Sequence, residues 1–165
     1  MPELLVATRN AGKIREIRLL LKEYPIKVSS LLDYPDMPEI VEDGDTFEAN
    51  AKKKALVIAK HTGRIVMGED SGLSVEGLDG RPGVYSARYA GEKATDQENN
   101  NKLLKEVRGM PLSKRKACYH SYIALADPTI DEWFDVVVAA EDDRDDAVVA
   151  ELQGRGAEAH GVRAD

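Results

Sequence analysis

Two adjacent carboxylates, Glu69 and Asp70, follow closely on the apolar run 65–67 and constrain this chain more than any other feature. The run predicts a buried β-strand, and apolar alternation resumes at 73–75 after a predicted turn at 71–72. Carboxylates at the end of a buried strand repel each other and lose hydration, so they persist most easily when a divalent cation or a proton neutralises them. For an isolated pair, a solvated turn after an edge strand is the alternative interpretation.

The composition restricts the class of protein and its compartment. At 165 residues and 18.1 kDa, the length fits one domain with a sizeable core. The net charge of −7 is unlike that of a general nucleic-acid binder, so a small anionic ligand would need a local cluster of cations or a bridging metal. No apolar run approaches the ~18 residues of a membrane span, and the N-terminus shows no signal-peptide pattern. With Cys118 as the single cysteine, no internal disulfide can form, so we expect a cytoplasmic protein. The charge and the lack of an apolar span predict neither a nucleic-acid nor a membrane partner.

The segment Thr8–Lys13, TRNAGK, is predicted to be a strand-to-helix turn between an apolar strand and a helical pattern that follows. Such a turn directs backbone amides and the positive end of the helix dipole toward an anion. It is not a Walker A loop, since that motif requires glycine at the position of Ala7 and Ser or Thr after Lys13. A plain helix start capped by Asn10 is the alternative.

A second predicted helix places a lysine among its apolar residues. The spacing of 45–48 resembles a capping box, and Gly63 ends the helical pattern. At about 100° per residue, Lys54 shares the apolar face, whereas 52–53 point toward water. Lys54 then either reaches the rim of the protein or projects into a cleft, together with Asn50 one turn before it.

The predicted elements alternate along the chain and indicate an α/β fold. Another helix begins at a capping box, Thr95–Glu98, and its polar first half, 99–101, is expected on the surface. The predicted strands lie near residues 3–7, 26–30, 65–69, 73–76, 115–126 and 132–139, and the predicted helices near 12–22, 46–61 and 95–108.

The segment GEDSGLSVEGLDGRPGVYSARYAG resembles the inosine triphosphatase-like family of nucleoside triphosphate pyrophosphatases, in which an acidic pair and Ser-Gly-Leu precede a Pro-Gly-x-Tyr-Ser-Ala-Arg-Tyr run. TRNAGK matches the family's phosphate-binding motif, and the resemblance extends from Met1 to about Pro128. It implies a mixed, elongated and twisted sheet flanked by helices, with two lobes around a central cleft. It also implies a homodimer.

The resemblance further implies Mg²⁺-dependent hydrolysis of inosine, deoxyinosine and xanthosine triphosphates to the monophosphate and pyrophosphate. Asp70 would prepare the attacking water, and Lys54 would act with it on the substrate phosphates. The residues implied to bind substrate are Thr8, Arg9, Asn10, Ala11, Gly12, Lys13, Lys54 and Ser71, and those implied to bind the metal are Glu42, Glu69 and Asp70.

The C-terminal part of the chain departs from this family pattern. In 136–165, 24 of 30 residues are Ala, Val, Asp, Glu or Gly, all encoded by codons that begin with G. The family's Gly-Phe-Gly-Tyr-Asp-Pro and Ser-His-Arg segments, which hold the purine base, are absent. We therefore expect a pyrophosphatase domain at 1–140 and an atypical, disordered or frame-shifted tail at 141–165. The alternative function is a degenerate nucleotide-binding or dimerisation module that lacks the base clamp.

Overall fold

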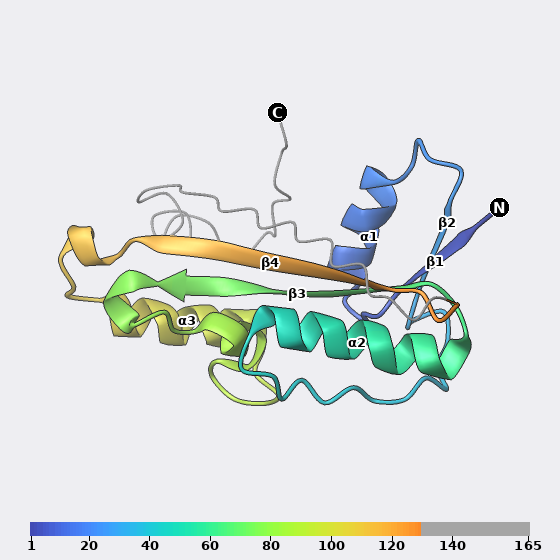
Figure 1. The fold of residues 1–165 in the computed structure, drawn as a ribbon. Coiled ribbons are helices and arrows are strands. Elements are labelled where there is room, and N and C mark those ends of the chain that lie inside the picture. The colour runs from blue at the N-terminus through green and yellow to red at the C-terminus, as the bar shows by residue number, and fades with distance from the viewer. Residues whose placement is uncertain (130–165) are drawn as a thin grey trace. The chain divides into compact units, whose positions relative to one another are not determined.

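The computed structural model describes residues 1–129 (Figure 1). These residues divide into two compact units. Residues 1–70 and 121–129 form the first unit, and 71–120 form the second. None of the helices in the described part of the chain is long and apolar enough to cross a membrane. The main elements are β1 (Glu3–Val6), α1 (Ala11–Leu20), β2 (Lys27–Ser30), α2 (Phe47–Thr62), β3 (Val66–Val75), α3 (Asp96–Val107) and β4 (Ala117–Ala126). Short 3₁₀ helices follow β3 and α3: η1 (Glu76–Leu78), η2 (Gly83–Arg88) and η3 (Leu112–Lys114).

The four strands form a mixed sheet in the order β2-β1-β3-β4, which confirms the predicted α/β class. β1 pairs in parallel with both β2 and β3. Side-chain hydrogen bonds link Ser121 to Glu69 and Tyr119 to Ser71, so residue numbers rise along β4 as they fall along β3. This register makes the β3–β4 pairing antiparallel.

The predicted turn at 71–72 is wrong, because β3 runs without interruption through the Ser-Gly pair. Small polar residues favour turns when only local propensity acts. Here the neighbouring strand β4, itself ten residues long, keeps the segment extended. The acidic pair consequently lies in the middle of a strand. The predicted strand at 132–139 lies outside the described residues.

Helix α2 supplies one side of the core of the first unit. Its small residues Ala51, Ala55 and Ala59, with Ile58, pack in one cluster with residues of the sheet such as Leu5. Side chains alternate along a strand, so the neighbour of Leu5 points to the opposite face, where α1 lies (Figure 1). The two helices therefore cover opposite faces of this part of the sheet.

The ends of α2 follow local chemistry, with one shift from the predicted cap. Thr46, not Asp45, is the N-cap, and its hydroxyl accepts a hydrogen bond from the Ala49 amide at 3.1 Å. Gly63 ends the helix in the left-handed conformation, with φ of 64°. Thr is favoured at the N-cap because its hydroxyl accepts from a free backbone N–H, and Gly is favoured after the last turn because it adopts the left-handed conformation without strain.

The second unit has its own small core, and one predicted surface residue belongs to its interior. The core comprises Val75, Leu78, Leu103 and Val107. The capping box at Thr95 and Glu98 is confirmed. Asn99, however, is 7% exposed, and the prediction that it lies on the surface is wrong. Its amide nitrogen donates to the Ala87 carbonyl at 3.0 Å and its oxygen accepts from the Ala90 amide at 2.7 Å, so it secures the segment around η2.

Strand β3 meets α2 at Gly68 with no space for a side chain. A Cβ at this position would lie 2.1 Å from the Ala51 carbonyl oxygen and 2.8 Å from the Ala55 nitrogen. Both atoms belong to the helix backbone, which cannot move aside as a flexible side chain can. This close contact sets the height of α2 above the sheet.

We predict that Gly68→Ala lowers the free energy of unfolding by about 3 kcal/mol or more, since the new methyl group displaces a helix. Gly80→Ala is the control, because Gly80 has φ of 81° and open space around it. Its loss should be about 1–2 kcal/mol from backbone conformation alone. Urea unfolding of both variants measures the difference. Equal losses would contradict the packing argument.

Candidate active site

The Lys54 ammonium group lies at the centre of a charged cluster in the first unit. Its nitrogen Nζ lies 3.0 Å from Asp70 Oδ1, 3.0 Å from Glu42 Oε1 and 3.0 Å from the Glu69 carbonyl oxygen. Its side chain is 8% exposed. The three N–H donors thus match three acceptors, two from β3 and one from the loop before α2, as a buried cation requires. The prediction that Lys54 faces inward is confirmed.

The neighbouring lysines show the same helical phase from the other side. The Lys53 side chain is 37% exposed and forms an ion pair with Asp43 at 2.5 Å. Lys52 forms an ion pair with Glu48 along the helix surface at 2.7 Å. Both lie on the solvent side of α2, as the 100° spacing predicts.

Asp70 is a buried carboxylate with its two oxygens held by α2. Oδ1 accepts from Lys54, and Oδ2 accepts from the Asn50 amide nitrogen at 3.1 Å. Burial raises the pKa of the Asp70 carboxyl above its usual range, while Lys54 and Asn50 oppose part of the rise. A raised pKa makes this carboxylate a stronger base than an exposed aspartate.

Glu69 points away from Asp70, because successive side chains of a strand alternate between faces. Its Oε2 forms an ion pair with Lys13 Nζ at 2.5 Å, and its Oε1 accepts from the Ser121 hydroxyl at 3.4 Å. The expected repulsion within the acidic pair is reduced because the two side chains point to opposite faces of the strand and each pairs with a different lysine. Ser121 escaped the sequence analysis, since only the β3–β4 register reveals its position.

The turn between β1 and α1 forms as predicted, with Asn10 as the N-cap. The Asn10 side-chain oxygen accepts from the amides of Gly12 at 2.9 Å and Lys13 at 3.2 Å. The Thr8 hydroxyl accepts from the Asn10 amide at 3.1 Å. The turn, including Ala11 at the first position of α1, is therefore ordered by its own side chains.

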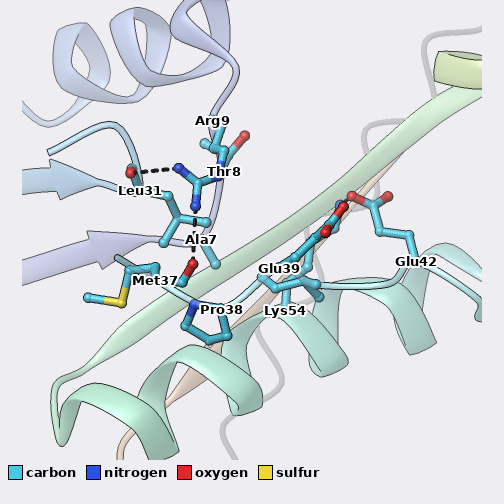
Figure 2. A pocket seen from close by; sticks show the side chains of 10 residues that line it. Ala7, Thr8, Arg9, Leu31, Met37, Pro38, Glu39, Glu42 and Lys54 are labelled. Atoms are coloured by element: carbon cyan, nitrogen blue, oxygen red, sulfur yellow. Dashed lines mark hydrogen bonds and ion pairs between the residues drawn. The ribbon is translucent and has the colours of Figure 1, made fainter. Parts of the chain in front are cut away.

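A cavity of about 410 Å³ connects this turn with the charged cluster (Figure 2). Arg9 crosses it and donates to the carbonyls of Leu31 and Met37, each at 3.3 Å. In this structure Arg9 thus ties the turn to the loop that leads to Glu42. The lining residues are Ala7, Thr8, Arg9, Leu31, Met37, Pro38, Glu39, Ile40, Glu42 and Lys54.

Ser71, the remaining residue of the predicted site, belongs to the second unit. Its hydroxyl oxygen accepts a hydrogen bond from the Tyr119 hydroxyl at 3.2 Å. It follows Asp70 directly in the same strand, and its side chain lies on the opposite strand face from that carboxylate.

The positions of the acidic side chains limit where a metal ion could bind. Among residues 1–129, no group of three Asp, Glu, His or Cys side chains is placed to hold a metal ion. Glu42 and Asp70 nevertheless approach a common point, each 3.0 Å from Lys54 Nζ. Mg²⁺ is commonly bound by one or two carboxylates, with water and substrate phosphates completing its shell. This pair fits such an ion, whereas the Glu69 carboxylate lies apart on Lys13.

The protein has an α/β fold in which lysine–carboxylate pairs lie beside a strand-to-helix turn. Such a site suits an anionic ligand and a cation together. The chain belongs to the Ham1 family, whose sequence profile matches residues 4–155. A relative from Geobacter sulfurreducens, named dITP/XTP pyrophosphatase, is 54% identical over 128 residues, 78% of this chain and 64% of that protein. Another of the same name, from Shouchella clausii, is 52% identical over 78% of this chain and 64% of its own length.

Solved structures of similar proteins share the fold. A HAM1 protein from Coxiella burnetii aligns with a TM-score of 0.71 and 37% identity, covering 81% of this chain and 68% of that one. A nucleoside-triphosphatase, also named dITP/XTP pyrophosphatase, from Mycobacterium abscessus gives a TM-score of 0.67 and 38% identity over 81% and 70% of the two chains. The chain spans less than two thirds of the length of both curated relatives described above.

The raised pKa of Asp70 predicts a specific pH dependence of stability. As pH rises above the ordinary aspartate pKa, the unfolded chain loses this proton first while the folded chain retains it. Asp70 therefore favours folding less as pH increases through this window. The stability of the wild type relative to Asp70→Asn should fall in urea unfolding as pH rises above the ordinary aspartate pKa of about 4. A difference that stays constant or grows would contradict the prediction.

Proposed function

We propose that this protein hydrolyses inosine, deoxyinosine and xanthosine triphosphates to the monophosphate and pyrophosphate with Mg²⁺, removing these nucleotides from the cellular pool. The observation that carries the proposal is the Lys54 ammonium group, which forms ion pairs with Asp70 and Glu42. Lys54 and Glu42 line one cavity together with Thr8 and Arg9. The names of the relatives support the choice of substrate. Neither the comparisons nor the described residues favour the degenerate binding module.

The cluster can exchange its internal ion pairs for ligand contacts. Glu42, Glu69 and Asp70 carry three negative charges, and two of their partners are the ammonium groups of Lys13 and Lys54. A triphosphate that arrives with a divalent cation offers the lysines new oxygen acceptors and the carboxylates a new cation. Positions that already balance charge without a ligand thus need little rearrangement to bind one.

In the proposed reaction, water attacks the α-phosphorus and the bond to the bridging oxygen breaks, so that pyrophosphate leaves. Asp70 orients the water and accepts its proton, a role that its raised pKa favours. Lys54 and Lys13 offset the negative charge on the phosphate oxygens. Ser71 and the Thr8–Lys13 turn are proposed to bind phosphate or sugar oxygens.

A divalent cation at this site would polarise the phosphate oxygens and lower the charge repulsion that water meets. Asp70 and Glu42 are proposed to hold it, and Glu69 to join them only if its carboxylate leaves Lys13. We propose Mg²⁺ as the ion, a homodimer as the assembly and the cytoplasm as the location, on the basis of the family resemblance. The predicted tail at 141–165, which lacks the family's base-binding segments, lies outside the described residues.

The proposal is tested by pyrophosphate release from inosine triphosphate with Mg²⁺. Asp70→Asn should lower kcat at least a hundredfold while the protein stays folded, because the amide cannot accept the proton from water. Asp79→Asn is the control, since Asp79 ends η1 in the left-handed conformation, which asparagine adopts as readily as aspartate. Comparable losses at the two positions, or full activity in Asp70→Asn, would refute the assignment.

Substitutions of two adjacent lysines test whether ligand binding depends on a specific position or only on the net charge of the protein. Lys54→Ala should weaken binding of the triphosphate at least tenfold, whereas Lys53→Ala should change it by less than about twofold, because only Lys54 faces the cavity. Calorimetric titration of folded variants, checked by thermal unfolding, measures both. Matching losses would show that net charge, not position, governs binding.

A further inference from the structure

Asn50 is a fully buried polar residue next to the charged cluster. Its exposure is 0%, and it lies on the inward face of α2, one turn before Lys54. An unpaired amide in such a place would lose its hydration without any compensating hydrogen bond. Asn50 instead forms three hydrogen bonds, two with the backbone of Gly44 and one with Asp70.

The two ends of the Asn50 amide have different partners, which fix its orientation. Its oxygen accepts from the Gly44 amide at 2.8 Å, and its nitrogen donates to Asp70 Oδ2 at 3.1 Å. A reversed amide would oppose oxygen to the carboxylate and N–H to the Gly44 N–H. Both contacts therefore select one arrangement.

On the strand side, Asn50 and Lys54 divide the Asp70 carboxylate between them. Lys54 holds Oδ1 and Asn50 holds Oδ2. Because both residues project from the same face of one rigid helix, the plane of the carboxylate is set by α2.

On the loop side, Asn50 secures the segment that carries Glu42. A Cβ on Gly44 would lie 2.6 Å from the Asn50 side-chain oxygen, so the loop backbone lies directly against the amide. Glu42 is two residues earlier and forms its ion pair with Lys54. The loop is thus held at two points by the same two helix residues that hold Asp70.

We propose that Asn50 is a positioning residue for the hydrolysis: it clamps the Asp70 carboxylate and the Glu42 loop into one arrangement. The inference rests on the proposed function, because it assigns Asn50 a role in that reaction. Asn50 itself makes no contact with the substrate in this role. It acts through the two carboxylates, so its loss should affect turnover more than substrate affinity.

The second unit supplies a matched control in Asn99. This asparagine is also buried on a helix, and it holds a loop through one backbone carbonyl and one backbone amide. Both of these partners are backbone groups around η2, from Ala87 and Ala90. Asn99→Ala therefore removes a similar buried clamp that holds backbone groups around η2 and not Asp70.

The experiment compares Asn50→Ala with Asn99→Ala in pyrophosphate release from inosine triphosphate and in thermal unfolding. Both should lower Tm. Asn50→Ala should lower kcat at least tenfold with KM changed less than threefold, because a displacement of about 1 Å can cost about a hundredfold in rate. Asn99→Ala should keep kcat within about twofold of the wild type. A wild-type kcat in Asn50→Ala, or an equal kcat loss in Asn99→Ala, would overturn the proposal.

Asn50→Asp covers the case in which Asn50→Ala does not fold. It retains the side-chain size and an acceptor for the Gly44 amide but, when ionised, has no donor for Asp70. Its kcat should also fall at least tenfold, and a wild-type kcat would overturn the proposal.

A readout independent of turnover separates the clamp from the reaction. Amide hydrogen exchange at Gly44 should accelerate at least tenfold in Asn50→Ala, which removes the acceptor of this amide, and stay unchanged in Asn99→Ala. Absence of pyrophosphate release by the wild-type protein would refute the proposed function alone. Unchanged exchange at Gly44 in Asn50→Ala would refute the clamp itself.

Discussion

The ion and hydrogen-bond cluster around the Lys54 ammonium group ties together the helix, strand and loop of the first unit. A cation taken out of water costs several kcal/mol unless its charge and all its N–H groups are matched. Lys54 meets this requirement with the Asp70 carboxylate, the Glu42 carboxylate and the Glu69 carbonyl oxygen. Since these acceptors come from β3 and from the loop before α2, all three segments must be in place together. A site that depends on such agreement is rigid before any ligand arrives.

Close packing of backbone makes this agreement possible. Gly68 lets α2 lie directly on β3, and Gly44 lets the loop lie directly on Asn50. The alanines of α2 fill the same interface with little volume. Without these small residues, the polar groups at the ends of the lysine and asparagine side chains would not reach the strand. Packing and electrostatics are thus two aspects of one contact between α2 and the sheet.

The sequence by itself determined the features that depend on neighbouring residues. The inward direction of Lys54 follows from helical periodicity, and the cap at Asn10 follows from the chemistry of a helix start. The mixed α/β class follows from the alternation of elements and from the family motifs. These properties are local, or repeat with a fixed period, so one sequence is enough to predict them.

Only the tertiary structure decided the features that depend on distant partners. The Ser71–Gly72 segment is extended because β4 pairs beside it, although its residues favour a turn. Asn99 is buried because its amide meets the backbone around η2, although its neighbours are polar. Glu69 of β3 pairs with Lys13 of α1, which lies 56 positions earlier in the chain. Such pairings arise from the register of strands and the height of helices above the sheet, which no local pattern encodes.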